Sequence, residues 1–108
     1  MARYMNRIEV RDPNALTNEI ADFLSGKGYK LGVYNGETVW HRNGFNCEQM
    51  IIIRYEPNAV ILTAFISFFD ALLGQTEMGI TGFVALAGKR PLKKVVKALE
   101  ELIKAKGA

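Results

Sequence analysis

Two Asn-Gly pairs, set eight residues apart, constrain the fold of this 108-residue chain more than any other feature of its sequence. They are Asn35-Gly36 and Asn43-Gly44. Asn and Gly both tolerate the positive φ angles of a type I′ turn, so the pair is the strongest short signal of a β-hairpin. Two such turns predict three consecutive antiparallel strands. A further turn at Pro57-Asn58 extends this meander into residues 59–69.

The register follows if each Asn-Gly pair is a two-residue loop. Trp40 then faces Leu31 on one neighbouring strand and Cys47 on the other. Alternate residues of a strand point to opposite sides, so the predicted strands have one apolar and one polar face. The apolar face carries Tyr29, Leu31, Val33, Trp40, Phe45 and Cys47. The polar face carries Lys30, Tyr34, Glu37, His41, Asn46 and Glu48.

His41 and Cys47 are the only residues of their types. A histidine six residues from a cysteine can act as the base for a thiol nucleophile. The predicted register places the two side chains on opposite faces of the sheet. We therefore expect a buried, unreactive thiol, a solvated histidine and no catalytic residues.

The strands on either side of Pro57-Asn58 are apolar on both faces. With a tight turn there, the core face continues through Ile51, Ile53, Leu62, Ala64, Ile66 and Phe68. The opposite face carries Met50, Ile52, Ile61, Phe65 and Phe69. A register shift of one residue would exchange the two sets.

This second apolar face needs a cover. Two helices of about 15 residues can cover one face of a five-stranded sheet but not both. Contiguous exposed apolar patches usually mark interfaces, so we expect a homodimer through the face that carries Phe65. The alternative is that residues 70–88 fold back and cover it.

Helical periodicity appears near both ends of the chain. Asp12-Pro13 is typical of a helix start, and Gly26 or Gly28 can provide a left-handed end. The apolar stripe between them consists of Leu16, Ile20, Phe23 and Leu24. A C-terminal helix is predicted to begin at Pro91, with Gly107 past its end and with its stripe at Leu92, Val95, Val96, Leu99, Leu102 and Ile103.

Weaker patterns predict a first strand at residues 7–10 and a last strand at residues 82–86. The expected fold is α+β. It has a twisted antiparallel meander of five or six strands, with an N-terminal helix and a C-terminal amphipathic helix packed on the sheet. The length of the chain corresponds to a single domain over residues 1–108.

Composition narrows the cellular context. One cysteine excludes an intramolecular disulfide, and no apolar run follows the N-terminal arginines. The most apolar stretch, residues 60–73, is shorter than the roughly 20 residues that cross a bilayer as a helix. We therefore expect a cytoplasmic protein without a secretion signal.

Charge is concentrated near the C-terminus, where residues 88–108 hold seven basic and two acidic groups. Lysine on the outer face of a docked helix explains this pattern, and only one arginine is present there to read bases. We expect neither nucleic-acid binding nor contact with a membrane surface. His and Cys do not occur at metal-ligand spacing, so no metal or cofactor is expected.

A set of short motifs resembles a pattern found in small uncharacterised bacterial proteins. The motifs are Trp40, Gly44-Phe45, Ala64-Phe65-Ile66, Glu77-Met78-Gly79-Ile80, Gly82-Phe83 and Leu92-Lys93-Lys94, spread over about half of the chain. The resemblance implies a bacterial, single-domain protein and transfers no site.

Two functions are compatible with these features. The first is a non-catalytic binding or self-association module. The alternative is a carrier of a small hydrophobic ligand, or an enzyme acting on one. Its pocket would lie between the C-terminal helix and the sheet, around Trp40, Phe65 and Phe83.

Overall fold

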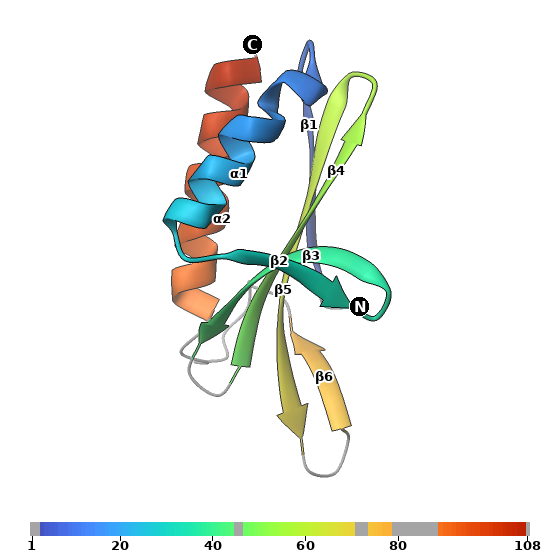
Figure 1. Cartoon of the computed structure of the whole chain (residues 1–108), viewed down its shortest axis with the longest axis vertical. Helices are drawn as coiled ribbons and strands as arrows, with labels where there is room; N and C mark the ends of the chain where they lie inside the picture. The colour runs from blue at the N-terminus through green and yellow to red at the C-terminus, as the bar shows by residue number, and fades with distance from the viewer. Residues whose placement is uncertain (1–2, 45–46, 71–73, 79–88, 108) are drawn as a thin grey trace.

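The computed structural model describes residues 3–44, 47–70, 74–78 and 89–107 and has an α+β architecture (Figure 1). Both α-helices lie on the same side of a twisted antiparallel sheet. The strands are β1 (Tyr4–Glu9), β2 (Lys30–Tyr34), β3 (Glu37–Gly44), β4 (Cys47–Glu56), β5 (Ala59–Asp70) and β6 (Gly74–Met78). The helices are a short 3₁₀ turn η1 (Pro13–Leu16), α1 (Thr17–Gly26) and α2 (Lys89–Gly107). The predicted fold class is confirmed.

The strand order is β1-β5-β4-β3-β2, and β6 also pairs with β5. Strands β2 to β5 form the predicted meander. β1 pairs with residues 59–64 of β5, and β6 pairs with residues 66–70 farther along the same strand. The first strand, predicted at residues 7–10, is longer than predicted and spans Tyr4–Glu9. Strand β6 was not predicted. The strand predicted at residues 82–86 lies outside the described residues. In the sheet formed by the described residues, β2 is an edge strand.

Two of the three predicted turns are confirmed. Tyr34 pairs with Glu37 across Asn35-Gly36, whose φ angles are 50° and 80°. Glu56 pairs with Ala59 across Pro57-Asn58. Both are two-residue loops.

The prediction for Asn43-Gly44 is wrong, because both residues belong to β3 and Gly44 pairs with Cys47. Trp40 therefore faces Ile51 rather than Cys47. The shift is four residues, an even number, so every side chain stays on its predicted face. A hydrogen-bonded pair between Arg42 and Gln49 stabilises the observed register.

The helices supply half of the main core. The buried side chains between helices and sheet include Leu16, Ile20, Leu24, Ile51, Leu62, Ala64, Ile66, Leu92, Leu99 and Ile103. Gly28, with a φ of 91°, lies just past the end of α1 in the left-handed conformation, and the amide of Tyr29 donates to the carbonyl of Leu24. The predicted helix start at Asp12-Pro13 is confirmed, because η1 begins at Pro13, but the side chain of Asp12 makes no capping hydrogen bond. Neither α1 nor α2, the α-helices of the described ranges, combines the length and apolar content of a membrane span.

The opposite face of the sheet has a smaller core of its own. Val39, Met50, Ile52 and Phe65 are buried there, with Tyr34 packed against them. Strand β3 pairs with β4 only from Trp40 onward, whereas its first residues pair with β2 alone. The β2–β3 hairpin therefore bends away from β4, as its course in Figure 1 shows. The bend brings Val39 and Tyr34 against the face that carries Phe65.

Candidate functional site

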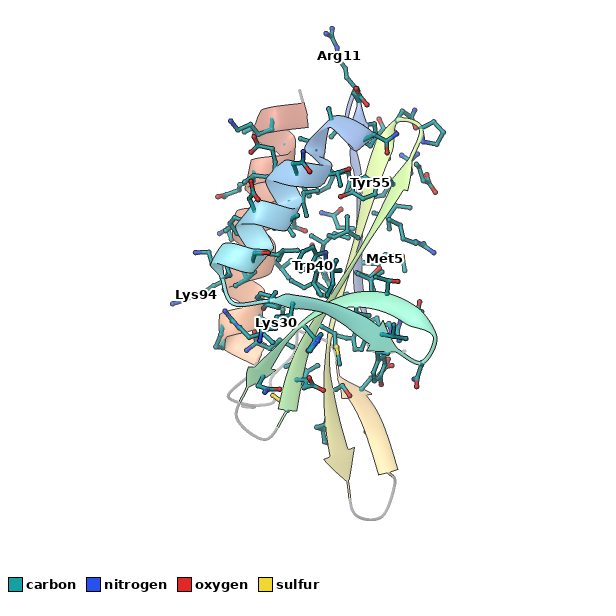
Figure 2. The ribbon with its side chains drawn as sticks, in the orientation of Figure 1. Met5, Arg11, Lys30, Trp40, Tyr55 and Lys94 are labelled. Atoms are coloured by element: carbon teal, nitrogen blue, oxygen red, sulfur yellow. The ribbon has the colours of Figure 1, made fainter. Side chains whose placement is uncertain are left out.

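A groove of about 280 Å³ lies between α1 and strands β2, β3 and β4. It is lined by Thr17, Ile20, Ala21, Leu31, Thr38, Trp40, Ile53 and Tyr55. Figure 2 shows Trp40 between the helices and the strands, with Tyr55 farther along β4. Five of the eight lining residues are apolar, and three carry hydroxyl groups. This balance is typical of a site for an apolar group with a few polar contacts at its margin.

The helix and the sheet each contribute one wall of the groove. Thr17, Ile20 and Ala21 follow the spacing of one helical face, and the small Ala21 side chain leaves space beneath α1. Trp40 pairs with Leu31 on one side and with Ile51 on the other, which fixes the indole in the middle of the sheet wall. Burial raises the pKa of Tyr55.

The groove opens beside the edge strand β2. Leu31 and Val33 are 59% and 77% exposed, although the sequence pattern predicted both on the core face. Their face was predicted correctly, but their burial was not. β2 begins near the end of α1 and runs away from both helices (Figure 1), which agrees with the exposure of these two side chains.

Among the described residues, the outer backbone groups of β2 have no strand to pair with. In a hairpin closed by a two-residue loop, Tyr34, Gly32 and Lys30 exchange hydrogen bonds with β3. Leu31 and Val33 therefore direct their N–H and C=O groups away from β3. In the described part of the chain no strand pairs with β2 on that side.

Trp40 and Phe65, two of the three residues predicted to surround a ligand, are not brought together. Trp40 lines the groove, but the groove lies under α1 rather than under the C-terminal helix α2. Phe65 lies on the other face of the sheet and is completely buried. Phe83 is outside the described residues. Of the two described residues, Trp40 has a place in the candidate site and Phe65 does not.

The predicted dimer surface is not exposed. Met50, Ile52, Ile61 and Phe65 are all buried within one chain, and the side chain of Phe69 is outside the described part of the structure. Ile61 is flanked on the neighbouring strands by Arg7 and Arg54, whose aliphatic stems can cover it. The expectation of an open apolar patch on this face is therefore wrong for these four residues.

A charged cluster closes this face above Phe65. The guanidinium carbon of Arg3 lies 4.1 Å from the ring centre of Phe65. Arg3 donates two hydrogen bonds of 2.8 Å to Glu77 on β6 and one of 3.1 Å to Glu37 on β3. The hydrogen bonds from Arg3 lower the pKa of Glu77. These charges are already paired, which favours a structural role for them.

Other polar side chains are also engaged in holding the fold. Oε1 of buried Gln49 accepts hydrogen bonds from Tyr29 and from Arg42, and Arg42 also donates to the carbonyl of Lys27. Burial raises the pKa of Tyr29 to about 12. Gln49 was missed in the sequence because a lone amide in an apolar strand gives no signal of its partners.

A second polar connection joins α2 to β1. The Tyr4 hydroxyl and the Asn6 amide both donate to Oε2 of Glu100. Burial and the bond to Glu100 raise the pKa of Tyr4 to about 12. This contact holds the middle of α2 against β1.

His41 and Cys47 lie on opposite faces, as the parity of their positions predicts. The Nδ1 atom of His41 is 3.2 Å from a carboxylate oxygen of Glu48, and its ring packs over Gly32. Cys47 is buried in the main core. The two residues do not form a nucleophile and base.

We expect Cys47 to react slowly with Ellman's reagent in the native protein. The reagent needs an accessible thiolate, and burial in an apolar core disfavours that form. The rate should rise by orders of magnitude in denaturant, where the thiol is exposed. Labelling at the same rate in both conditions would contradict the burial of Cys47.

Within the described ranges, no group of three or more His, Cys, Asp or Glu side chains is placed to hold a metal ion. The groove and the β2 edge therefore stand as the candidate site, with apolar contact and backbone hydrogen bonding as their chemistry. Comparison of the chain with protein-family models, with curated proteins and with solved structures found no match.

Proposed function

We propose that this protein is a non-catalytic binding module that holds an extended apolar segment along β2. One observation carries the proposal. Leu31 and Val33, two of the three most exposed large apolar side chains of the described residues, lie together on an edge strand beside an apolar groove. The third, Met5, is on β1.

The chemistry of strand addition fits this arrangement. An extended segment that pairs with a sheet edge gains affinity from backbone hydrogen bonds and specificity from its alternate side chains. The free N–H and C=O groups of Leu31 and Val33 supply the bonds. The groove beside Leu31 accommodates an apolar side chain of the incoming segment.

The edge also lacks most of the usual protection. Natural edge strands are blocked by charged side chains, proline or bulges. β2 has the sequence KLGVY, in which Lys30 is the only charged residue. An edge of this kind is suited to pairing.

A second candidate function is the binding of a small apolar ligand in the groove alone. Trp40 and the nearby hydroxyls of Thr38 and Tyr55 favour it. A small ligand would use the groove without the backbone of β2. The two functions therefore respond differently to changes in Leu31.

Trp40 is the only tryptophan, so its fluorescence reports on the groove. We expect a blocked pentapeptide of alternating threonine and valine to change this emission in a saturable way, at protein concentrations of a few micromolar. Leu31→Lys should weaken the peptide about tenfold or more, because it removes an apolar contact of about 1.5–3 kcal/mol.

Met5→Lys is the matched control, because Met5 is 60% exposed but lies on β1. It should leave the affinity for the peptide unchanged. Equal weakening by both variants would contradict the proposed site. Binding of the apolar dye anilinonaphthalene sulfonate near Trp40, with no response to the peptide, would favour the small-ligand function instead.

A further inference from the structure

We infer that the segment held by β2 is the β2 strand of a second copy of this chain, paired antiparallel about a two-fold axis at Gly32. The inference rests on the proposed function of the β2 edge as a docking site. It goes further by naming the partner and the register.

The free backbone groups limit the register. The amide of Tyr29 already donates to Leu24, so the free edge begins after it. Asn35, with a φ of 50°, belongs to the turn and ends the edge. Only Leu31 and Val33 then offer both N–H and C=O groups outward.

A two-fold axis at Gly32 uses all of these groups. Leu31 of each copy faces Val33 of the other, and each facing pair exchanges two hydrogen bonds, which gives four bonds in total. With the axis at Leu31, Val33 would face Tyr29, whose amide already donates to Leu24. With the axis at Val33, Leu31 would face Asn35, which belongs to the turn. The edge is therefore complementary to itself in one register, as an isologous interface requires.

Side chains agree with this register. Leu31 and Val33 from both copies gather on one face, so four exposed apolar side chains cover one another. Gly32 faces its own copy at the axis, in the pair type where the two backbones approach most closely. Glycine has no side chain that could separate the two backbones at this point. A Cβ atom on Gly32 would also lie only 2.8 Å from Nε2 of His41 in the same chain, which is closer than van der Waals contact.

No like charges face each other across the same axis. Lys30 faces Tyr34 of the other copy, and Glu37 is paired with Tyr34 on the next strand. Lys30 is the only charged residue of β2, so the two paired strands place no like charges opposite each other. An unrelated extended peptide could form the same backbone hydrogen bonds, but it would not reproduce the facing of Leu31 and Val33 in both directions.

The interface is small, because five residues of a strand span only about 17 Å. We therefore expect a dimer that forms reversibly at micromolar or higher concentration. Sedimentation velocity from about 1 µM to about 1 mM should show the average mass rising from that of one chain towards twice that value.

Two double variants test the register. Leu31→Lys with Val33→Lys places like charges opposite each other and should leave a monomer at all concentrations. Leu31→Lys with Val33→Glu places opposite charges in each facing pair and should retain the dimer. Met5→Lys, at a site of nearly equal exposure to Leu31, should also retain it.

A dimer that survives Leu31→Lys with Val33→Lys, or a loss of the dimer in Met5→Lys, overturns the inference. If the double-lysine variant does not fold, hydrogen exchange of the wild type replaces it. Protection of the Leu31 and Val33 amides should then increase with protein concentration. Protection that is independent of concentration overturns the inference.

The outcomes also separate the inference from the proposed function. A wild type that stays monomeric while the threonine-valine peptide binds in a Leu31-dependent way keeps the docking site and overturns the second copy as its occupant. A monomer that also fails to bind the peptide overturns both. A dimer with the expected response to both double variants supports both.

Discussion

Phe65→Lys is expected to unfold the protein rather than to convert a dimer into a folded monomer. Phe65 is completely buried, and its ring centre lies 5.5 Å from that of Tyr34. Replacing a buried phenylalanine with alanine alone costs about 3–5 kcal/mol. A lysine there adds a desolvated charge next to Arg3, which already covers the ring. The sum is comparable to the whole stability of a small domain, about 5–15 kcal/mol.

Circular dichroism and thermal melting measure this effect. Phe65→Lys should lack a cooperative transition at temperatures where the wild type is folded. Met5→Lys is the control, because Met5 is on the same face of the sheet and is 60% exposed. It should melt within a few degrees of the wild type. A folded Phe65→Lys protein would contradict the observed burial and restore this face as an interface.

The two faces of the sheet could be predicted because they depend only on alternation. Trp40 and Ile51 share the helix side, whereas Met50 and Phe65 share the other, even though the β3–β4 register was wrong by four residues. An even error preserves parity. The periodicity of α2 was equally local: five of the six predicted apolar residues are buried, and the sixth, Leu102, is partly buried against the main core.

Burial of each face could not be predicted, because it depends on contacts between distant segments. Arg3 covers Phe65 through partners 34 and 74 residues away, Glu37 and Glu77. No local pattern signals such a meeting. The bend of β3 that brings Val39 to the same core is likewise set by where its pairing with β4 stops.

The candidate site was predicted only in part, for the same reason. Trp40 was identified from its type, but its cover was assigned to the wrong helix. Leu92, Leu99 and Ile103 of α2 are completely buried, so α2 fills the space against its part of the sheet. The edge position of β2 follows from the pairing of β1 with β5, which strand patterns alone do not reveal. That pairing leaves Leu31 at an open edge.

Removal of residues 89–108 is expected to abolish folding. Five apolar side chains of α2 are buried in the main core, and each contributes about 1.5–3 kcal/mol before conformational entropy is subtracted. The truncation also removes Glu100, which accepts the hydrogen bonds of Tyr4 and Asn6, and Gly107, whose carbonyl accepts from Arg11. The loss is comparable to the whole stability of a small domain, about 5–15 kcal/mol. The truncated chain should therefore show no cooperative melting transition and no slowly exchanging amides.

The truncation also removes basic charge, and a variant that changes charge alone separates the two effects. Lys93, Lys94 and Lys97 are exposed on α2, so replacing all three with glutamine should shift the melting temperature by only a few degrees. Apolar burial rather than charge then accounts for the role of the helix. A truncated chain that melts cooperatively would instead show that the sheet and α1 form a stable core by themselves. In that case α2 would be a separable basic element, and its exposed lysines would become candidates for binding an anionic partner.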